Sequence, residues 1–161
     1  MAESSGPEKI GQFTFTEDEI IRFARLYDPQ LFHTDPKAAE RGMFGVLIAS
    51  GWHVAMAWMG CFVRHTGMPP DYVEGMETDE ARILSPVGVG ISCDKMRWHA
   101  PVRVNDTIIF DTEVLSRRAS SSRPGWEVIF RRSHARREDG TLVMSHEITH
   151  LMPVATPPAR D

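Results

Sequence analysis

The chain has 161 residues, a length that fits one domain with a sizeable core. Its hydrophobic content of 42% and charged content of 25% exclude a disordered or fibrous protein. The net charge of −4 argues against a nucleic-acid partner, and two cysteines are too few for a disulfide framework. We therefore expect a single domain in a reducing compartment, the cytoplasm.

The first predicted elements lie between residues 11 and 28. The segment "GQFTFT" is typical of a short strand, and Thr16 with Glu19 three residues later forms a capping box. An amphipathic helix over residues 17–28 follows and ends before Pro29. Residues 1–10 are polar, without the apolar run of a signal peptide, and we expect them to form a flexible tail.

Residues 45–63 form a run of nineteen residues without Asp, Glu, Lys or Arg. Apolar residues recur at helical spacing from Ile48, which predicts a helix of about five turns that ends before Gly67. The length also satisfies the criterion for a membrane span. However, the run contains Ser50, Gly51 and His53 and has no second apolar partner segment, so we expect a helix buried in a protein core and no membrane partner. Residues 67–88 predict a long loop.

The second half of the chain changes to a period of two. Four strands are predicted within residues 91–102, 106–118, 125–137 and 141–152, and the short turns between them favour an antiparallel meander. In the last strand, one face carries Leu142, Met144, His146, Ile148, His150 and Met152. A sheet wrapped around one long apolar helix gives an α+β protein with a single hot-dog fold. We expect it to span residues 11–153, with a tail at 154–161.

Four segments together resemble the MaoC-like dehydratases, a family that includes (R)-specific enoyl-CoA hydratases. They are "YDPQLFHTDP", "FGVLIASGW", "MRWHAPVRVNDTIIFDTEVL" and "GTLVMSHEITHLM". The resemblance implies a homodimer, or a higher oligomer of dimers, that hydrates an acyl thioester carried by CoA or a carrier protein. Carried over by position, its catalytic pair is Asp28 and His33. The chain departs from the family pattern at Gln30-Leu31-Phe32, at Ser50 and at Met56, which affects the expected substrate rather than the chemistry.

The same residues suit this reaction on chemical grounds. Hydration of an enoyl thioester needs a base for water, an acid for C2 and donors for the developing enolate oxygen. Asp28 and His33 can together supply the base and the acid, with either of them delivering the C2 proton, and the backbone N–H of Gly51 at the helix start can serve as the oxyanion donor. We predict further substrate contacts from Ser50, Tyr27, Trp52 and Met56, and no cofactor.

Other interpretations remain open for each residue. Asp28 and His33 can be structural, Gly51 can be required for tight packing, and Asp35 is typical of a helix N-cap. His33-Thr34-Asp35 also has the spacing of an iron-binding pair, but no third ligand can be chosen, so we predict no metal. Thioester hydrolysis and non-catalytic binding of acyl thioesters are the alternative functions.

Overall fold

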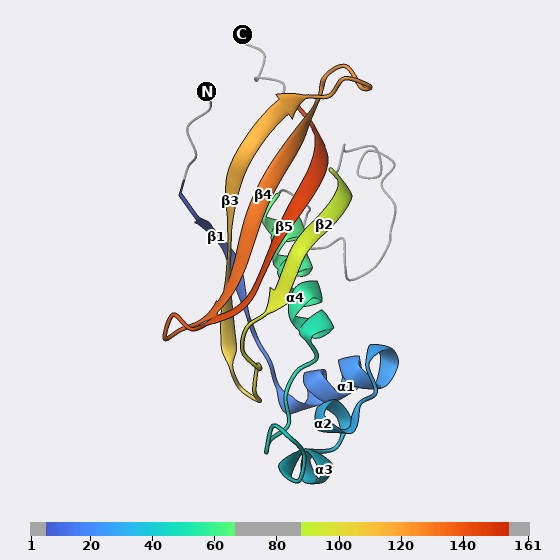
Figure 1. Cartoon of the computed structure of the whole chain (residues 1–161), viewed down its shortest axis with the longest axis vertical. Helices are drawn as coiled ribbons and strands as arrows, with labels where there is room; N and C mark the ends of the chain where they lie inside the picture. Colours follow the sequence, from blue (N-terminus) through green and yellow to red (C-terminus); the bar gives the residue numbers. More distant parts are fainter. Residues whose placement is uncertain (1–5, 67–87, 155–161) are drawn as a thin grey trace.

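In the computed structural model, which describes residues 6–66 and 88–154, a five-stranded antiparallel sheet packs against one long helix (Figure 1). The strands are β1 Glu8–Thr14, β2 Val89–Trp98, β3 Thr107–Ala119, β4 Trp126–Arg137 and β5 Leu142–Pro153. The helices are α1 Glu17–Tyr27, α2 Leu31–Thr34, α3 Pro36–Glu40 and α4 Gly51–His65. This is the predicted α+β hot-dog fold. The predicted loop at 67–88 lies outside the described residues, apart from Gly88.

The order of strands in the sheet is β1-β3-β4-β5-β2. Strands β3, β4 and β5 form a meander as predicted, but the prediction that β2 precedes them in the same meander is wrong, because β2 pairs with β5 at the opposite edge from β1. The connection between β2 and β3 explains this position. Val102 O accepts a hydrogen bond from Ala49 N at 2.8 Å, and Asn105 N donates to Phe15 O at 2.7 Å. The connection is therefore held against the segment before α4 and the end of β1, and it carries the chain from one edge of the sheet to the other.

The first strand begins earlier than predicted. Residues 8–10, expected in the flexible tail, belong to β1 because Glu8 and Lys9 pair with β3 and the Ile10 side chain is buried. The helix that follows is capped as predicted. Thr16 Oγ1 accepts a hydrogen bond from Glu19 N at 3.4 Å and donates one to Glu19 Oε2 at 2.8 Å.

Helix α4 begins at Gly51 rather than Ile48. Ser50 caps it by accepting a hydrogen bond from Trp52 N at 3.2 Å, whereas Ile48 forms an isolated β-bridge with Arg103. One face of α4 is buried against the sheet, and its other face leaves Trp52, Met56 and Met59 exposed. In the single chain the helix is thus covered on one side and not all round. Within residues 6–66 and 88–154, no helix is long and apolar enough to cross a membrane.

The inner face of the sheet supplies the rest of the core. The face of β5 that carries Met144, His146, Ile148 and His150 is the buried one, and Val143 on the opposite face is buried as well. They pack with residues of α4 such as Trp58, whose ring lies 4.2 Å from that of His146.

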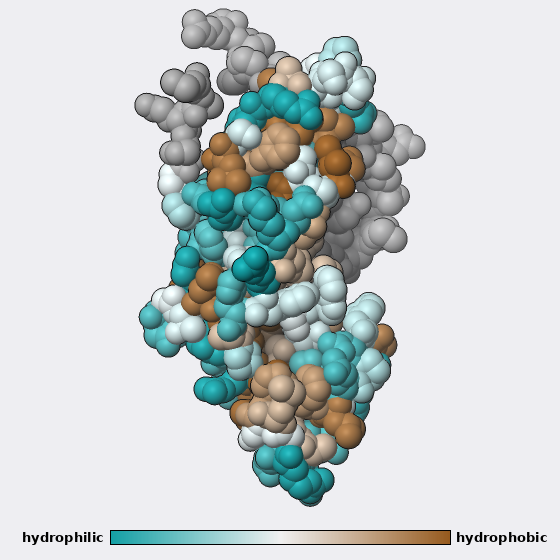
Figure 2. All heavy atoms as spheres, viewed as in Figure 1, coloured by the Kyte–Doolittle hydropathy of each residue, from teal (hydrophilic) through white to brown (hydrophobic). Residues whose placement is uncertain are grey.

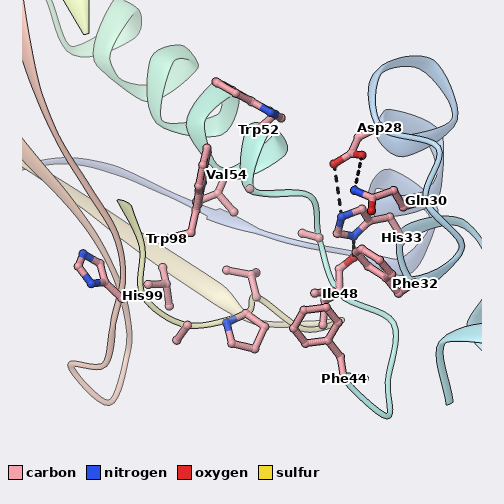
Figure 3. Close-up of a pocket in the computed structure, with 16 residues that line it drawn as sticks. Asp28, Gln30, Phe32, His33, Phe44, Ile48, Trp52, Val54, Trp98 and His99 are labelled. Carbon is pink, nitrogen blue, oxygen red and sulfur yellow. Dashed lines mark hydrogen bonds and ion pairs between the residues drawn. The ribbon is translucent and has the colours of Figure 1, made fainter. Parts of the chain in front are cut away.

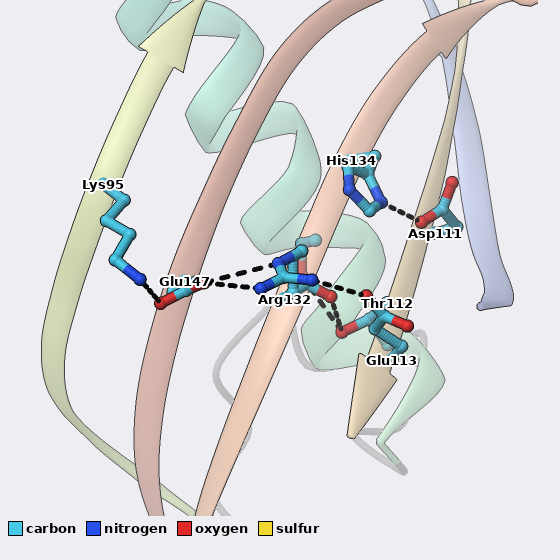
Figure 4. A network of polar contacts seen from close by, with 8 residues as sticks. Lys95, Asp111, Thr112, Glu113, Arg132, His134 and Glu147 are labelled. Carbon is cyan, nitrogen blue, oxygen red and sulfur yellow. Dashed lines mark hydrogen bonds and ion pairs between the residues drawn. The ribbon is translucent and has the colours of Figure 1, made fainter. Parts of the chain in front are cut away.

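The outer face of the sheet is charged. Arg132 contacts Glu147 at 2.9 Å and Glu113 at 3.4 Å, and Lys95 contacts Glu147 at 2.9 Å, so one network spans four strands (Figure 4). Hydrophilic residues cover much of the middle of the face seen in Figure 2. Exposed ion pairs contribute little stability. The charged outer face stays in contact with solvent, and the inner face is the one that packs against α4.

Candidate active site

A cavity of about 440 Å³ lies at the N-terminal end of α4 (Figure 3). Its volume falls within the range of small-molecule sites, about 300–1,000 Å³. Three segments surround it: the turn from α1 to α2, the start of α4 with the residues before it, and the connection from β2 to β3. The lining is mainly apolar, with Asp28, Gln30 and His33 together on one wall. An apolar trough with a polar group at one place suits a ligand that reacts at a single position.

The turn between α1 and α2 brings Asp28 and His33 together. Asp28 is the C-cap of α1, because Pro29 prevents the helix from continuing, and the chain re-enters a helical turn at Leu31. The two side chains then converge, with His33 Nε2 at 3.4 Å from Asp28 Oδ2. His33 is 4% exposed, whereas the Asp28 side chain is 19% exposed at the cavity wall. The spacing of five residues read from the sequence therefore produces a contact.

The ring orientation of His33 is fixed from its other side. His33 Nδ1 lies 2.7 Å from the carbonyl oxygen of Ile48. A carbonyl can only accept a hydrogen bond, so Nδ1 carries a proton. In the neutral ring Nε2 is then the unprotonated nitrogen, and it faces the Asp28 carboxylate. Two acceptors face one another at this point, an arrangement that suits a shared proton or a donating water molecule.

The Asp28 carboxylate accepts two hydrogen bonds. Gln30 Nε2 donates to Oδ1 at 2.8 Å, and Ser50 Oγ donates to Oδ2 at 2.7 Å. Burial by itself raises the pKa of Asp28, but the hydrogen bonds from Ser50 and Gln30, with the nearby His33, outweigh it and lower that pKa below its ordinary value. Asp28 is thus an anion at neutral pH.

Gly51 lies on the cavity wall as the first residue of α4. Its N–H makes no hydrogen bond with any residue in the described ranges, and it stands at the positive end of the helix dipole. A Cβ atom on Gly51 would lie 2.5 Å from Trp98 Nε1. Glycine therefore allows the indole to pack against the start of the helix, and no described residue pairs with the backbone N–H at this position.

The remaining predicted contacts lie in three different positions. Trp52 lines the cavity and lies edge-on to Trp98, with ring centroids 5.2 Å apart. Ser50 is buried behind the wall, where it contacts Asp28. Tyr27 and Met56 do not line the cavity: Tyr27 packs on Phe23 at 4.9 Å and is 70% exposed, and Met56 is on the exposed side of α4.

Sequence reasoning assigned a role at this site to only some of the residues that line the cavity. Those it missed include Gln30, Phe44, Trp98 and His99. Gln30 lies within the same motif as Asp28 and His33, and its proximity to Asp28 was the available signal. Phe44, Trp98 and His99 come from segments whose meeting depends on the tertiary path of the chain, and no local pattern indicated it.

The His33-Thr34-Asp35 pair does not converge on one point. Asp35 Oδ1 accepts a hydrogen bond from Ala38 N at 3.1 Å, which confirms its predicted role as the N-cap of α3. Within residues 6–66 and 88–154, no group of three or more His, Cys, Asp or Glu side chains is arranged to hold a metal ion.

Comparison with known proteins places this geometry in context. Residues 4–125 match the family described as the MaoC like domain. An uncharacterised Bacillus subtilis protein is 31% identical over 79 residues, and the match spans 49% of this chain and only 56% of that relative. The structure of a MaoC-like dehydratase from Rhodospirillum rubrum is 25% identical with a TM-score of 0.75, covering 98% of this chain and 96% of that one. An (R)-hydratase from A. caviae shares the fold at 18% identity and a TM-score of 0.67, covering 94% and 98%.

Proposed function

Because the chain belongs to the MaoC-like domain family, we propose that it adds water to, or removes it from, the 2,3-double bond of an acyl thioester. The observation that carries this proposal is the contact between Asp28 and His33 on the wall of an otherwise apolar cavity. Solved relatives include a dehydratase and an (R)-hydratase, which supports the reaction class. The substrate would be an enoyl group carried by CoA or by a carrier protein.

In the proposed reaction, one water molecule binds between the two side chains. It donates one hydrogen to Asp28 and one to His33 Nε2, about 2.8 Å from each, which leaves an oxygen lone pair for the substrate. The oxygen attacks C3, the electron pair of the C2–C3 double bond moves to the thioester oxygen, and the water proton passes to His33 Nε2. The imidazolium then returns a proton to C2 as the enolate collapses to the 3-hydroxyacyl thioester. Dehydration is the reverse sequence.

The developing enolate needs a hydrogen-bond donor close to its oxygen. The N–H of Gly51 supports this role, since it has no hydrogen-bond partner among the described residues and Gly51 lines the cavity at the positive end of α4. The apolar wall formed by Phe32, Phe44, Trp52 and Trp98 would then hold the acyl chain.

A direct test offers purified protein a panel of trans-2-enoyl-CoA esters of different chain length and branching. Loss of the conjugated double bond without release of free thiol is the expected result, and chiral analysis of the product gives its stereochemistry. Release of free thiol would instead identify the reaction as thioester hydrolysis. Saturable binding of the esters without turnover would instead identify a non-catalytic acyl-thioester-binding subunit.

The proposed active unit is a homodimer. A stripe of α4 formed by Trp52, Met56 and Met59 is exposed, and the edge of β2 away from β5 is unpaired within the described residues. Exposed apolar stripes and open sheet edges are both features that a partner subunit usually covers. Since Trp52 also lines the cavity, the partner would close the substrate site on that side.

A further inference from the structure

Ser50 occupies an unusual position between the helix start and the acid–base pair. It is 1% exposed and is the N-cap of α4. Its Oγ accepts a hydrogen bond from Trp52 N at 3.2 Å, and it donates its single hydrogen to Asp28 Oδ2 at 2.7 Å. We propose that Ser50 is a positioning residue, whose hydroxyl fixes the Asp28 carboxylate beside His33 so that the mobile proton is carried by His33.

The contacts around Asp28 lead to this assignment. Ser50 binds Oδ2, the oxygen that faces His33 Nε2 at 3.4 Å, while Gln30 binds Oδ1 at 2.8 Å. Two donors from two different segments therefore set the plane of the carboxylate. A carboxylate that accepts such bonds is favoured as an anion, and it remains an acceptor for water. His33 Nε2 is then the nitrogen free to gain and lose a proton, since Nδ1 is held by the Ile48 carbonyl.

Ser50 acts through Asp28 and not on the substrate. It was predicted as a substrate contact, but it does not line the cavity and its hydroxyl hydrogen is already donated. A residue that only capped α4 would need no partner 22 positions earlier in the chain. The short Ser50–Asp28 hydrogen bond joins the start of α4 to the turn after α1, and these two segments supply the proposed oxyanion donor and the acid–base pair. The catalytic consequence rests on the proposed function, whereas the effect on Asp28 does not.

The experiment compares four variants of the full chain. Ser50→Ala and Ser50→Gly both remove the hydroxyl, but glycine is almost as good an N-cap as serine. Ser50→Thr keeps the hydroxyl and serves as the rescue. Thr16→Ala, which removes the cap of α1 far from the cavity, controls for loss of a helix cap alone. The Asp28 carboxyl carbon is followed by ¹³C NMR in aspartate-labelled protein from pH 8 down to the acid unfolding transition, with Asp28→Asn giving its assignment.

We expect Ser50→Ala and Ser50→Gly to shift the Asp28 carboxyl resonance at pH 7 and to raise the pH at which it begins to titrate by about one to two units, the effect of losing a hydrogen bond to a charged group. Ser50→Thr should restore the wild-type curve, and Thr16→Ala should lower the melting temperature without moving it. With an enoyl-CoA that the wild type hydrates, kcat should fall about tenfold in Ser50→Ala and Ser50→Gly while KM stays nearly constant.

Two results separate the proposals. A folded Ser50→Ala protein whose Asp28 resonance and titration superimpose on those of the wild type overturns the positioning role, whether or not the protein hydrates enoyl thioesters. A shifted Asp28 titration in a protein that turns over no enoyl ester supports the positioning role and refutes the proposed function alone.

Discussion

Acidification should destabilise this protein strongly because three imidazoles lie in its core. His53, His146 and His150 are each 7% exposed or less, and burial lowers the pKa of each to about 4. Neither nitrogen of His146 has a hydrogen-bond partner among the described residues, and its ring packs edge-on against Trp58. A ring in this environment is stable only in its neutral form.

The loss of stability on acidification follows from the pKa of each histidine in the unfolded chain and in the folded chain. The ordinary value of 6.5 applies to the unfolded chain and about 4 to the folded one, so the unfolded chain binds more protons as the pH falls through this window. The contribution of each ring is fully present above pH 6.5. It is reduced by about 2 kcal/mol at pH 5 and by about 3 kcal/mol at pH 4. Three rings together remove about 6 kcal/mol at pH 5, which is comparable with the whole stability of a domain, about 5–15 kcal/mol. Asp28 contributes below this window, because its ordinary pKa of 3.8 is lowered further by folding.

Urea unfolding at pH 7.5, 6 and 5 measures this dependence. His146→Phe keeps an aromatic ring against Trp58 and removes one titrating group, so its free energy of unfolding should fall by about 2 kcal/mol less than that of the wild type between pH 7.5 and 5. Trp58→Phe is the matched control: it disturbs the same contact without removing a titrating group, and should lower stability equally at every pH. Identical pH dependence in His146→Phe and the wild type would refute the reasoning.

Four further outcomes are expected. Asp28→Asn and His33→Ala should each lower the hydration rate about 10²- to 10⁴-fold at nearly constant melting temperature. The double variant should be scarcely slower than either single variant. Full activity in a well-folded Asp28→Asn protein would refute the acid–base proposal. Gly51→Ala should cost about 1–3 kcal/mol because its Cβ would meet Trp98, and adding Trp98→Ala should restore the stability. Sedimentation at micromolar concentration should give a dimer, and a monomer alone would contradict the proposed interface. Exhaustive chelation should leave turnover unchanged, whereas activity restored only by added iron or zinc would refute the metal-free reaction.

The features that the sequence predicted are those set by neighbouring residues. Thr16 and Asp35 cap their helices because a side-chain oxygen and a nearby N–H are three residues apart. The alternation in β5 placed Met144, His146, Ile148 and His150 together on one face because successive side chains of a strand point to opposite sides. Asp28 and His33 meet because Pro29 ends one helix and the next turn begins at once.

The features that it did not predict depend on distant residues. The segment before Thr107 was interpreted as a hairpin turn, and Asn105 does adopt a positive φ of 66°. The turn nevertheless does not pair β2 with β3, because Asn105 N donates a hydrogen bond to Phe15 O, a residue far away in the sequence. The start of α4 was placed at Ile48 because the apolar spacing continues through it, while the cap at Ser50 interrupts the helix there.

Backbone groups of the segment before α4 hold the parts of the site in fixed positions relative to one another. Ile48 N donates to Phe32 O at 3.1 Å, and Ile48 O accepts from His33 Nδ1 at 2.7 Å, so one residue binds α2 through both of its backbone groups. Ala49 N then donates to Val102 O, which joins the same short segment to the connection between β2 and β3. Two residues later comes Gly51, whose N–H is the proposed oxyanion donor. The distance between Asp28 and His33 and the proposed oxyanion donor is therefore set by the backbone contacts of Ile48 and Ala49 together with the Ser50–Asp28 hydrogen bond. Substitutions at Phe44 or Trp98, which take part in none of these hydrogen bonds, should accordingly alter which ligand the cavity accepts while the contact between Asp28 and His33 stays in place.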